Sequence, residues 1–99
     1  PNATIMGYGT DQAVVNDRIL ADSAGGTFTI TLPLNASLLI NDTIQIIDAT
    51  SNFGTNAVTV ARNGSLIQGS ADDLTMDLNG AIATLIYTGP TYGWIIGAV

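Results

Sequence analysis

The chain has 99 residues, of which 46% are hydrophobic and only 10% are charged, and its formal net charge is −6. It contains eight aspartates and two arginines but no histidine, cysteine, lysine or glutamate, so the usual proton carrier, thiolate ligands and most covalent nucleophiles are missing. We therefore expect one domain that is not an enzyme and uses no cofactor or metal, and the acidic balance argues against nucleic-acid and membrane partners, since both favour a basic patch.

The first part of the chain, residues 1–17, carries the weakest pattern. One weak strand is expected at Thr4–Tyr8, and the whole stretch is interpreted as an N-terminal arm or an irregular strand segment. Such an arm is expected to reach a neighbouring subunit or partner, because its own sequence gives it little reason to be ordered alone. A small residue such as Pro1 commonly follows a removed initiator Met, which favours a complete small gene product over a fragment.

In residues 18–99, apolar and polar residues alternate in a way that is typical of half-buried strands. The clearest case is Thr27–Leu32, which puts three apolar side chains on one face before Pro33 ends the run. The other strands are expected at Arg18–Ala21, Thr43–Asp48, Ala57–Ala61, Leu74–Leu78, Ile82–Tyr87 and Trp94–Ala98, with a short extra strand at Leu66–Gln68 and one helical turn at Ala36–Leu38. This spacing predicts a single all-β domain, an antiparallel β-sandwich or barrel of about eight short strands.

Turn residues stand between these strands. Asn63–Gly64 and Asn79–Gly80 predict hairpin turns, because tight hairpins need residues that adopt positive φ. Asp22, Asp42 and Asp48 stand at strand ends, where aspartate commonly accepts hydrogen bonds from a following turn. The inward positions of the strands predict a core made of Phe28, Ile30, Leu32, Ile44, Ile46, Val58, Val60, Leu74, Met76 and Leu78.

The last two strands differ from the others because both of their faces carry large apolar groups. In Ile82–Tyr87, Ile82 and Ile86 occupy one face, whereas Leu85 and Tyr87 occupy the other. One face can pack into the core, but the second needs cover. That cover comes either from the N-terminal arm or from another subunit, and the sequence leaves both alternatives open. The candidate oligomer or partner interface consists of Tyr8, Ile82, Leu85, Tyr87, Tyr92, Trp94 and Ile96.

Two weaker signals concern ligands. Asp72, Asp73, Asp77 and Asn79 form the densest acidic cluster, and oxygen ligands suit Ca²⁺ or Mg²⁺. Their spacing matches no calcium loop, so the solvated flank of a hairpin is the favoured interpretation. Tyr92–Trp94 is a candidate platform for a sugar ring, although a bend that delivers the tryptophan into the core is favoured.

Two carboxylates suffice for a glycosidase, but no pair of aspartates here has a spacing that supports one.

A series of short motifs runs in a distinctive order over about three-quarters of the chain. They are Ile19–Asp22, Gly26–Pro33, Asn41–Asp48, Phe53–Asn56 with Val58–Val60, Arg62–Ser65 with Ile67 and Gly69, Asp73–Thr75, Leu85–Tyr87 and Gly93–Trp94. In this order the chain resembles a small β-rich module of tailed-bacteriophage virion proteins, which occurs in capsid decoration, head-fibre and tail-fibre proteins. Asn41 stands where this family has a glycine, which leaves the type of that turn open.

The resemblance implies a structural protein of the virion, often a homotrimer, with no catalytic residues. The leading hypothesis is a capsid decoration (cement) protein that contacts the major capsid protein or another virion protein and stabilises the particle from outside. The alternative is the tip of a tail or head fibre that recognises a host surface glycan through Tyr8, Tyr92 or Trp94.

Overall fold

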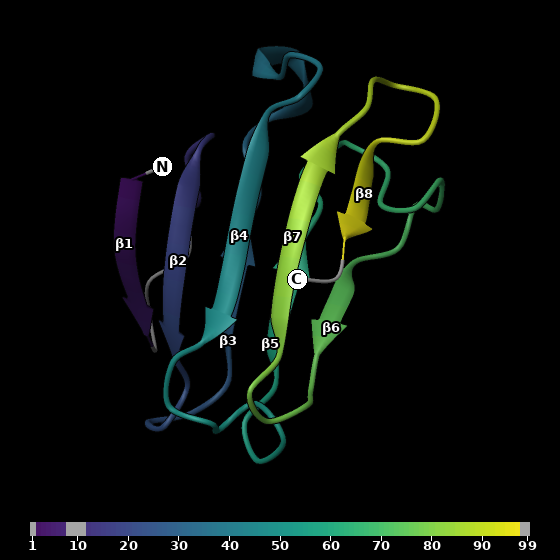
Figure 1. The fold of residues 1–99 in the computed structure, drawn as a ribbon. Helices are drawn as coiled ribbons and strands as arrows, with labels where there is room; N and C mark the ends of the chain where they lie inside the picture. Colours follow the sequence, from purple (N-terminus) through teal and green to yellow (C-terminus); the bar gives the residue numbers. More distant parts are fainter. Residues whose placement is uncertain (1, 8–11, 98–99) are drawn as a thin grey trace.

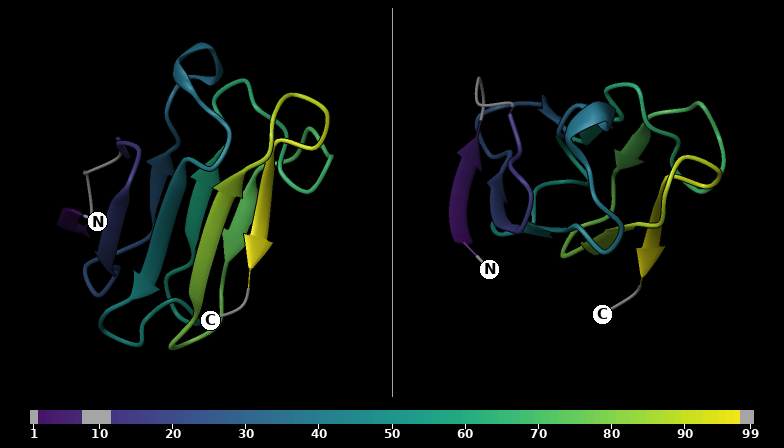
Figure 2. Two further views of the ribbon diagram at one scale, coloured as in Figure 1. Left: turned by 45° about the horizontal axis from the view of Figure 1, so that its top comes forward. Right: turned by 90° about the horizontal axis from the view of Figure 1, so that it is seen from above.

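The computed structural model describes residues 2–7 and 12–97, with the backbone alone for residues 2–5. Its elements are β1 (Asn2–Gly7), β2 (Asp17–Asp22), β3 (Phe28–Thr31), the 3₁₀ turn η1 (Asn35–Ser37), β4 (Thr43–Asp48), β5 (Val58–Ala61), β6 (Leu74–Met76), β7 (Ile82–Tyr87) and β8 (Trp94–Gly97). The strands form two stacked layers, a five-stranded sheet in the order β1-β2-β4-β7-β8 and a three-stranded sheet in the order β3-β5-β6 (Figure 1, Figure 2). The predicted all-β sandwich of eight short strands is confirmed. Within residues 2–7 and 12–97, no helix is long and apolar enough to cross a membrane.

The prediction that the sheets are antiparallel is wrong in part, because both sheets are mixed. β1–β2, β2–β4 and β3–β5 are parallel pairs, whereas β4–β7, β7–β8 and β5–β6 are antiparallel. For β2–β4 and β3–β5 the reason is the path of the chain, which alternates between the layers from β2 to β5. Two successive crossings return the chain to the same sheet in its original direction, so the strand that it adds there is parallel.

The core lies between the two layers and follows the predicted alternation closely. Of the predicted core residues, eight are buried, and Ile30, Ile44 and Val60 are completely inaccessible to solvent. Leu74 is only half-buried. The prediction for Leu78 is wrong: its side chain is 71% exposed, because β6 already ends at Met76 and the chain turns away before reaching Leu78.

The two predicted hairpins have the expected residues but different roles. Asn63 and Gly64 both have positive φ, 50° and 92°, yet a connection over residues 62–73 separates β5 from β6. Asn79–Gly80 does not form a hairpin, since it lies between β6 and β7, which belong to different sheets. Asn41 has a φ of 79°, which is the left-handed conformation that glycine favours and that asparagine tolerates.

Aspartates organise several of the connections, as expected for strand ends. The carboxylate of Asp42 accepts the backbone N–H of Leu39 at 2.8 Å, and that of Asp22 accepts the N–H of Ala24 at 3.0 Å. Asp48 is buried, and its carboxylate accepts three backbone N–H groups from two connections between the sheets, those of Asn52, Phe53 and Gly80. Burial alone raises the pKa of Asp48, but these hydrogen bonds outweigh it and lower the pKa below its ordinary value.

Residues 2–7, which belong to the predicted N-terminal arm, lie in the sheet itself. They form β1, which pairs in parallel with β2 from Asn2↔Asp17 to Gly7↔Asp22. β1 therefore extends the five-stranded sheet sideways at its edge and does not lie across the sheet's outer face (Figure 1). The strand predicted at Thr4–Tyr8 is found one to two residues earlier, and Tyr8 lies outside the described residues.

Candidate interaction surface

The candidate functional site is the face of the five-stranded sheet that points away from the three-stranded layer, which we call the outer face. Strand register aligns its side chains in rows. One row consists of Leu20, Ile47 and Ile82, the next of Arg18, Gln45 and Thr84, and the third of Thr43, Ile86 and Ile95. Two apolar rows therefore flank a polar one.

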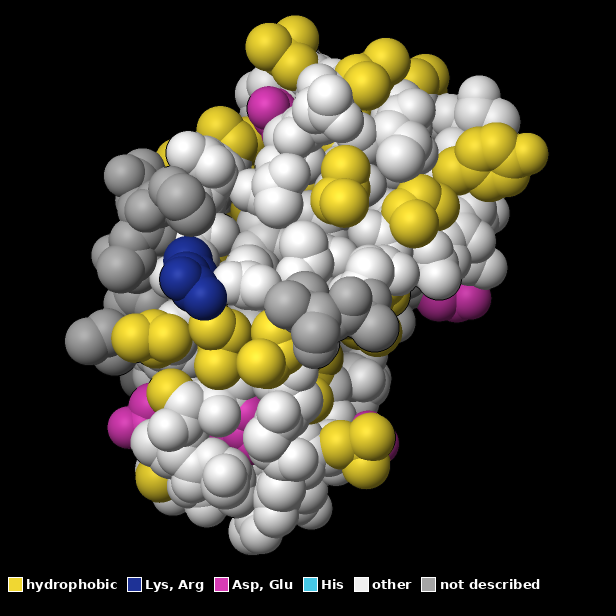
Figure 3. Space-filling view, viewed as in Figure 1, with side chains coloured by type: hydrophobic (Ala, Val, Ile, Leu, Met, Phe, Trp, Pro, Cys, Tyr) yellow, Lys and Arg dark blue, Asp and Glu magenta, His cyan; other side chains and the backbone are white. Residues whose placement is uncertain are grey.

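The apolar rows remain partly accessible to solvent. Ile82 is 42% exposed, and Leu20, Ile47, Ile86 and Ile95 are half-buried by their neighbours in the sheet. Figure 3 shows apolar side chains as a band across this face, beside a patch of positive charge. An antiparallel or mixed sheet with one solvated face normally carries polar residues there, so a contiguous aliphatic surface of this kind indicates an interaction site.

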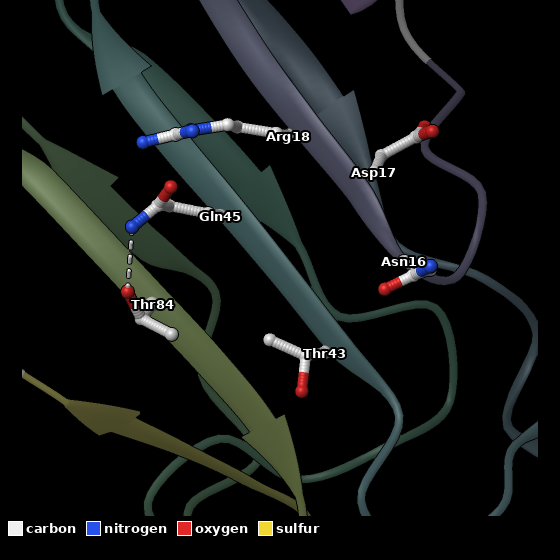
Figure 4. A pocket seen from close by; sticks show the side chains of 6 residues that line it. All are labelled: Asn16, Asp17, Arg18, Thr43, Gln45 and Thr84. Atoms are coloured by element: carbon white, nitrogen blue, oxygen red, sulfur yellow. Dashed lines mark hydrogen bonds between the residues drawn. The ribbon is translucent and has the colours of Figure 1, made fainter. Parts of the chain in front are cut away.

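The polar row forms a shallow hollow of about 220 Å³ between β2, β4 and β7 (Figure 4). Arg18 extends from β2 over β4, and Gln45 donates a hydrogen bond from Nε2 to Thr84 Oγ1 at 3.2 Å. The carboxylate of Asp17 points to the other side, where its Oδ2 accepts the backbone N–H of Val14 at 2.9 Å. The hollow thus offers hydrogen-bond donors and acceptors to a ligand or partner, but no nucleophile paired with a base.

The residues of the candidate interface divide into two groups in the structure. Leu85 and Trp94 are completely buried and Tyr87 is 7% exposed, so their side chains form part of this chain's own core. The rings of Tyr87 and Trp94 meet edge to face with their centroids 5.5 Å apart. Ile82 and Tyr92 are exposed, and Ile96 is half-buried at the sheet edge. Tyr8 lies outside the described residues.

The candidate interface expected from the sequence omits three residues of the outer face, Leu20, Ile47 and Arg18, although the sequence holds a signal for the first two. In Ile19–Leu20 and in Ile46–Ile47, two consecutive aliphatic residues interrupt the alternation, so one of each pair must face outward. The outward member is identified only by the register, which places Leu20 beside Ile47 and Ile47 beside Ile82.

The aromatic segment Tyr92–Trp94 is built as a bend that buries its tryptophan. The backbone N–H of Trp94 donates to the carbonyl of Leu66 at 2.8 Å. Gly93 has a φ of 70°, and a Cβ at this position would collide with that same carbonyl. The bend therefore aims Trp94 inward and leaves Tyr92, which is 62% exposed, as the aromatic side chain on the surface of this segment.

The acidic cluster around β6 is spread over separate contacts. Asp73 Oδ1 accepts the backbone N–H of Arg62 at 3.0 Å, and Asn79 Oδ1 accepts that of Gly54 at 2.8 Å. Within residues 2–7 and 12–97, no group of three or more acidic side chains is placed to hold a metal ion.

Comparison with protein-family models and with curated proteins gives no match for this chain.

Proposed function

We propose that this chain is a non-catalytic structural module of a tailed-bacteriophage particle, and that it acts as a capsid decoration protein on the outside of the shell. The observation that carries the proposal is the outer face, on which five leucine and isoleucine side chains lie across four adjacent strands. Of the side chains that form its three rows, only Arg18 is charged. The motif resemblance from Arg18 to Trp94 is the reason for proposing a bacteriophage particle as the assembly in which this surface is used.

In this proposal the outer face is buried when copies of the chain assemble, and the assembled form is the one that attaches to the shell. Removal of apolar surface from water contributes roughly 25 cal/mol per Å², so two aliphatic rows provide the main driving force. The orientation of the neighbouring copy is set by the polar row of Arg18, Gln45 and Thr84, because polar groups need hydrogen-bond partners once water is excluded. Closed association also protects a chain with so few charges from uncontrolled sheet-to-sheet contact.

The experiment is attachment to shells that lack this protein. The wild-type chain and the double variant Ile47→Thr, Ile86→Thr are mixed with such shells and sedimented, and occupied shells are imaged by cryo-electron microscopy. Threonine keeps the β-branched shape that strands favour while removing the aliphatic surface. The matched control is Leu39→Thr, since Leu39 is 72% exposed in a loop away from the outer face.

We expect the wild type and the control to occupy regular positions on the shell, and the double variant to be lost during sedimentation. Equal occupancy by all three proteins would show that the outer face takes no part in attachment. Absence of wild-type density from the shell would contradict the decoration role and leave the fibre tip as the alternative function.

The alternative, a fibre tip that recognises a host glycan, has less support. Stacking on a sugar ring needs an exposed aromatic face, and Trp94 and Tyr87 are buried. Within the described residues this leaves Tyr92 to serve as the platform.

A further inference from the structure

A second surface lies at the open side of the sandwich, where the edge of the three-stranded sheet meets β7 and β8. It is a groove of about 180 Å³, which we call the β6 groove. Its apolar walls are Leu74, Met76, Leu78, Ile82, Ala83 and Ile96. Met76 and Ala83 are buried, whereas Leu78 is 71% exposed. The groove therefore connects the core directly with solvent.

The backbone of β6 has an open edge beside this groove. Leu32 N–H donates to the Ala61 carbonyl at 2.9 Å, so Ala61 directs its backbone groups toward β3. Because these directions alternate along a strand, Val58 and Val60 direct theirs toward β6, where they pair with Met76 and Leu74. The N–H and carbonyl of Thr75, between these two residues, consequently point outward.

Two other sheet edges, those of β8 and β3, are contacted by further segments of the chain itself. The outer edge of β8 is occupied by residues 66–68, since Trp94 N–H donates to Leu66 and Gln68 N–H donates to Trp94, at 2.8 and 2.7 Å. The outer edge of β3 receives the N–H of Ala13, which donates to Thr31 at 2.8 Å. Among the described residues, no backbone group pairs with the outer edge of β6.

Charge distinguishes the partners that this edge can accept. Asp72 and Asp73 precede β6 and Asp77 follows Met76, and all three side chains are exposed. The guanidinium of Arg62 is engaged elsewhere, donating to the Ser65 carbonyl at 3.0 Å. Alternation places the side chains of Asp73, Thr75 and Asp77 on the solvent-facing side of the sheet, opposite to those of Leu74 and Met76.

A second copy of this chain is a poor occupant. Antiparallel pairing of two β6 edges about Thr75 would place Asp73 of one copy opposite Asp77 of the other, and like charges in directly opposed positions destabilise a strand pair. The chain has only two arginines and no lysine with which to compensate. The acidic residues therefore keep copies of the chain apart at this edge.

We propose that the β6 groove binds an extended segment of a different protein in which aliphatic residues alternate with lysine or arginine. The segment adds a strand to the three-stranded sheet and pairs with the N–H and carbonyl of Thr75. Its aliphatic side chains enter the groove beside Leu74 and Met76, while its basic side chains lie next to Asp73 and Asp77. This interaction does not depend on the proposed role in a virion.

The probe is a synthetic peptide, acetyl-Lys-Val-Lys-Val-Lys-Val-Lys-amide with a fluorescent label, titrated with the full chain at low salt. Two control peptides separate the contribution of charge from that of alternation. The first replaces each lysine with glutamate and tests charge. The second groups the same lysines and valines into two blocks and tests alternation. We expect saturable binding of the alternating basic peptide that weakens as salt is added, and much weaker binding of both controls.

Three protein variants complete the test. Asp73→Asn with Asp77→Asn should weaken binding about tenfold, because exposed ion pairs each contribute modestly; asparagine at 73 can still accept the Arg62 N–H. Thr75→Pro should abolish binding, since it removes the outward N–H while an edge position tolerates proline. Leu39→Thr should bind like the wild type. Urea unfolding of each variant confirms that the fold is retained.

Binding of the peptide to Thr75→Pro with wild-type affinity would reduce the interaction to non-specific charge attraction and overturn the proposal. Absence of saturable binding to the wild type would also overturn it and leave Asp73 and Asp77 as protection of a strand edge. The failure of this proposal is distinguishable from failure of the proposed function, because attachment to shells is measured on the outer-face variants, which leave Thr75 and the two aspartates unchanged.

Discussion

The Oδ2 atom of Asp48 accepts a hydrogen bond from the backbone N–H of Gly80 at 2.9 Å. Asp48 ends β4, and Gly80 lies in the connection from β6 to β7. The same carboxylate accepts the N–H groups of Asn52 and Phe53, each at 3.1 Å, in the connection from β4 to β5. Both connections carry the chain from one sheet to the other, so one buried carboxylate fixes how the two layers are joined.

The first prediction is that Asp48→Asn lowers the free energy of unfolding by about 1–3 kcal/mol, because a neutral amide turns a donor group toward N–H groups that need an acceptor. Urea unfolding at neutral pH measures the change. The matched control is Asp77→Asn, whose side chain is exposed and whose effect should stay within about 0.5 kcal/mol. Equal losses in both variants would mean that net charge, and not the Asp48 hydrogen bonds, controls stability.

The second prediction concerns pH. Burial alone raises the pKa of Asp48, but its backbone hydrogen bonds lower it below the ordinary value of 3.8. The unfolded chain therefore takes up this proton at a higher pH than the folded chain. The stabilisation is fully present above the unfolded pKa and is lost as pH falls through the lower folded pKa.

The difference in unfolding free energy between wild type and Asp48→Asn should accordingly be constant near neutral pH and shrink as the pH drops below 3.8. Urea titrations of both proteins across this range provide the measurement. A difference that stays constant down to the acid-unfolded state would contradict the assignment.

The strands could be predicted from the sequence because alternation is a local property. The alternation predicts Ile82–Tyr87 and Thr43–Asp48 with the same bounds that the structure shows. Sheet membership could not be predicted, since it depends on which layer each connection reaches. Asn79–Gly80 has the residues of a hairpin, yet Asp48 holds Gly80 in a crossing between layers. For the same reason the alternation that continues to Leu78 did not reveal that β6 ends at Met76.

The residues of the outer face were only partly predictable from the sequence, for a related reason. Where both faces of a strand are apolar, as in Ile82–Tyr87, the pattern does not say which face is inside. The stacking of β7 over the three-stranded sheet decides this, burying Leu85 and Tyr87 and leaving Ile82 outside. The rows of the outer face arise from pairing between strands that are distant in sequence, so no local window contains them.

The third prediction concerns the bend before β8. Gly93→Ala places a Cβ against the Leu66 carbonyl at a φ of 70°, and should lower the free energy of unfolding by more than about 3 kcal/mol. Gly80→Ala is the control, since its φ of 75° is similar but its Cβ would meet open space; it should cost about 1–2 kcal/mol. Similar losses in both variants would show that the close approach to Leu66 has no effect.

The fourth prediction tests the core assignment. Ile30 is completely buried, so Ile30→Ala should lower the free energy of unfolding by about 2–5 kcal/mol through lost burial and the cavity left behind. Leu78→Ala removes a comparable side chain that is 71% exposed, and should change stability by less than about 0.5 kcal/mol. Denaturant unfolding of both variants makes the comparison, and a loss below ~1 kcal/mol for Ile30→Ala would place that side chain outside the core.

The last prediction is that the chain self-associates through its outer face, as a trimer on the strength of the motif resemblance. Ile47 lies in the middle of an apolar row, between Leu20 and Ile82. Ile47→Lys puts a charge where neighbouring subunits would exclude water, and an unpaired buried charge is strongly unfavourable. Leu39→Lys adds the same charge at a position that is 72% exposed and away from this face. Light scattering at micromolar concentration should therefore give an oligomer for the wild type and Leu39→Lys, and a monomer for Ile47→Lys. A monomeric wild type would remove self-association from the proposal, and an oligomeric Ile47→Lys would move the contact to another surface.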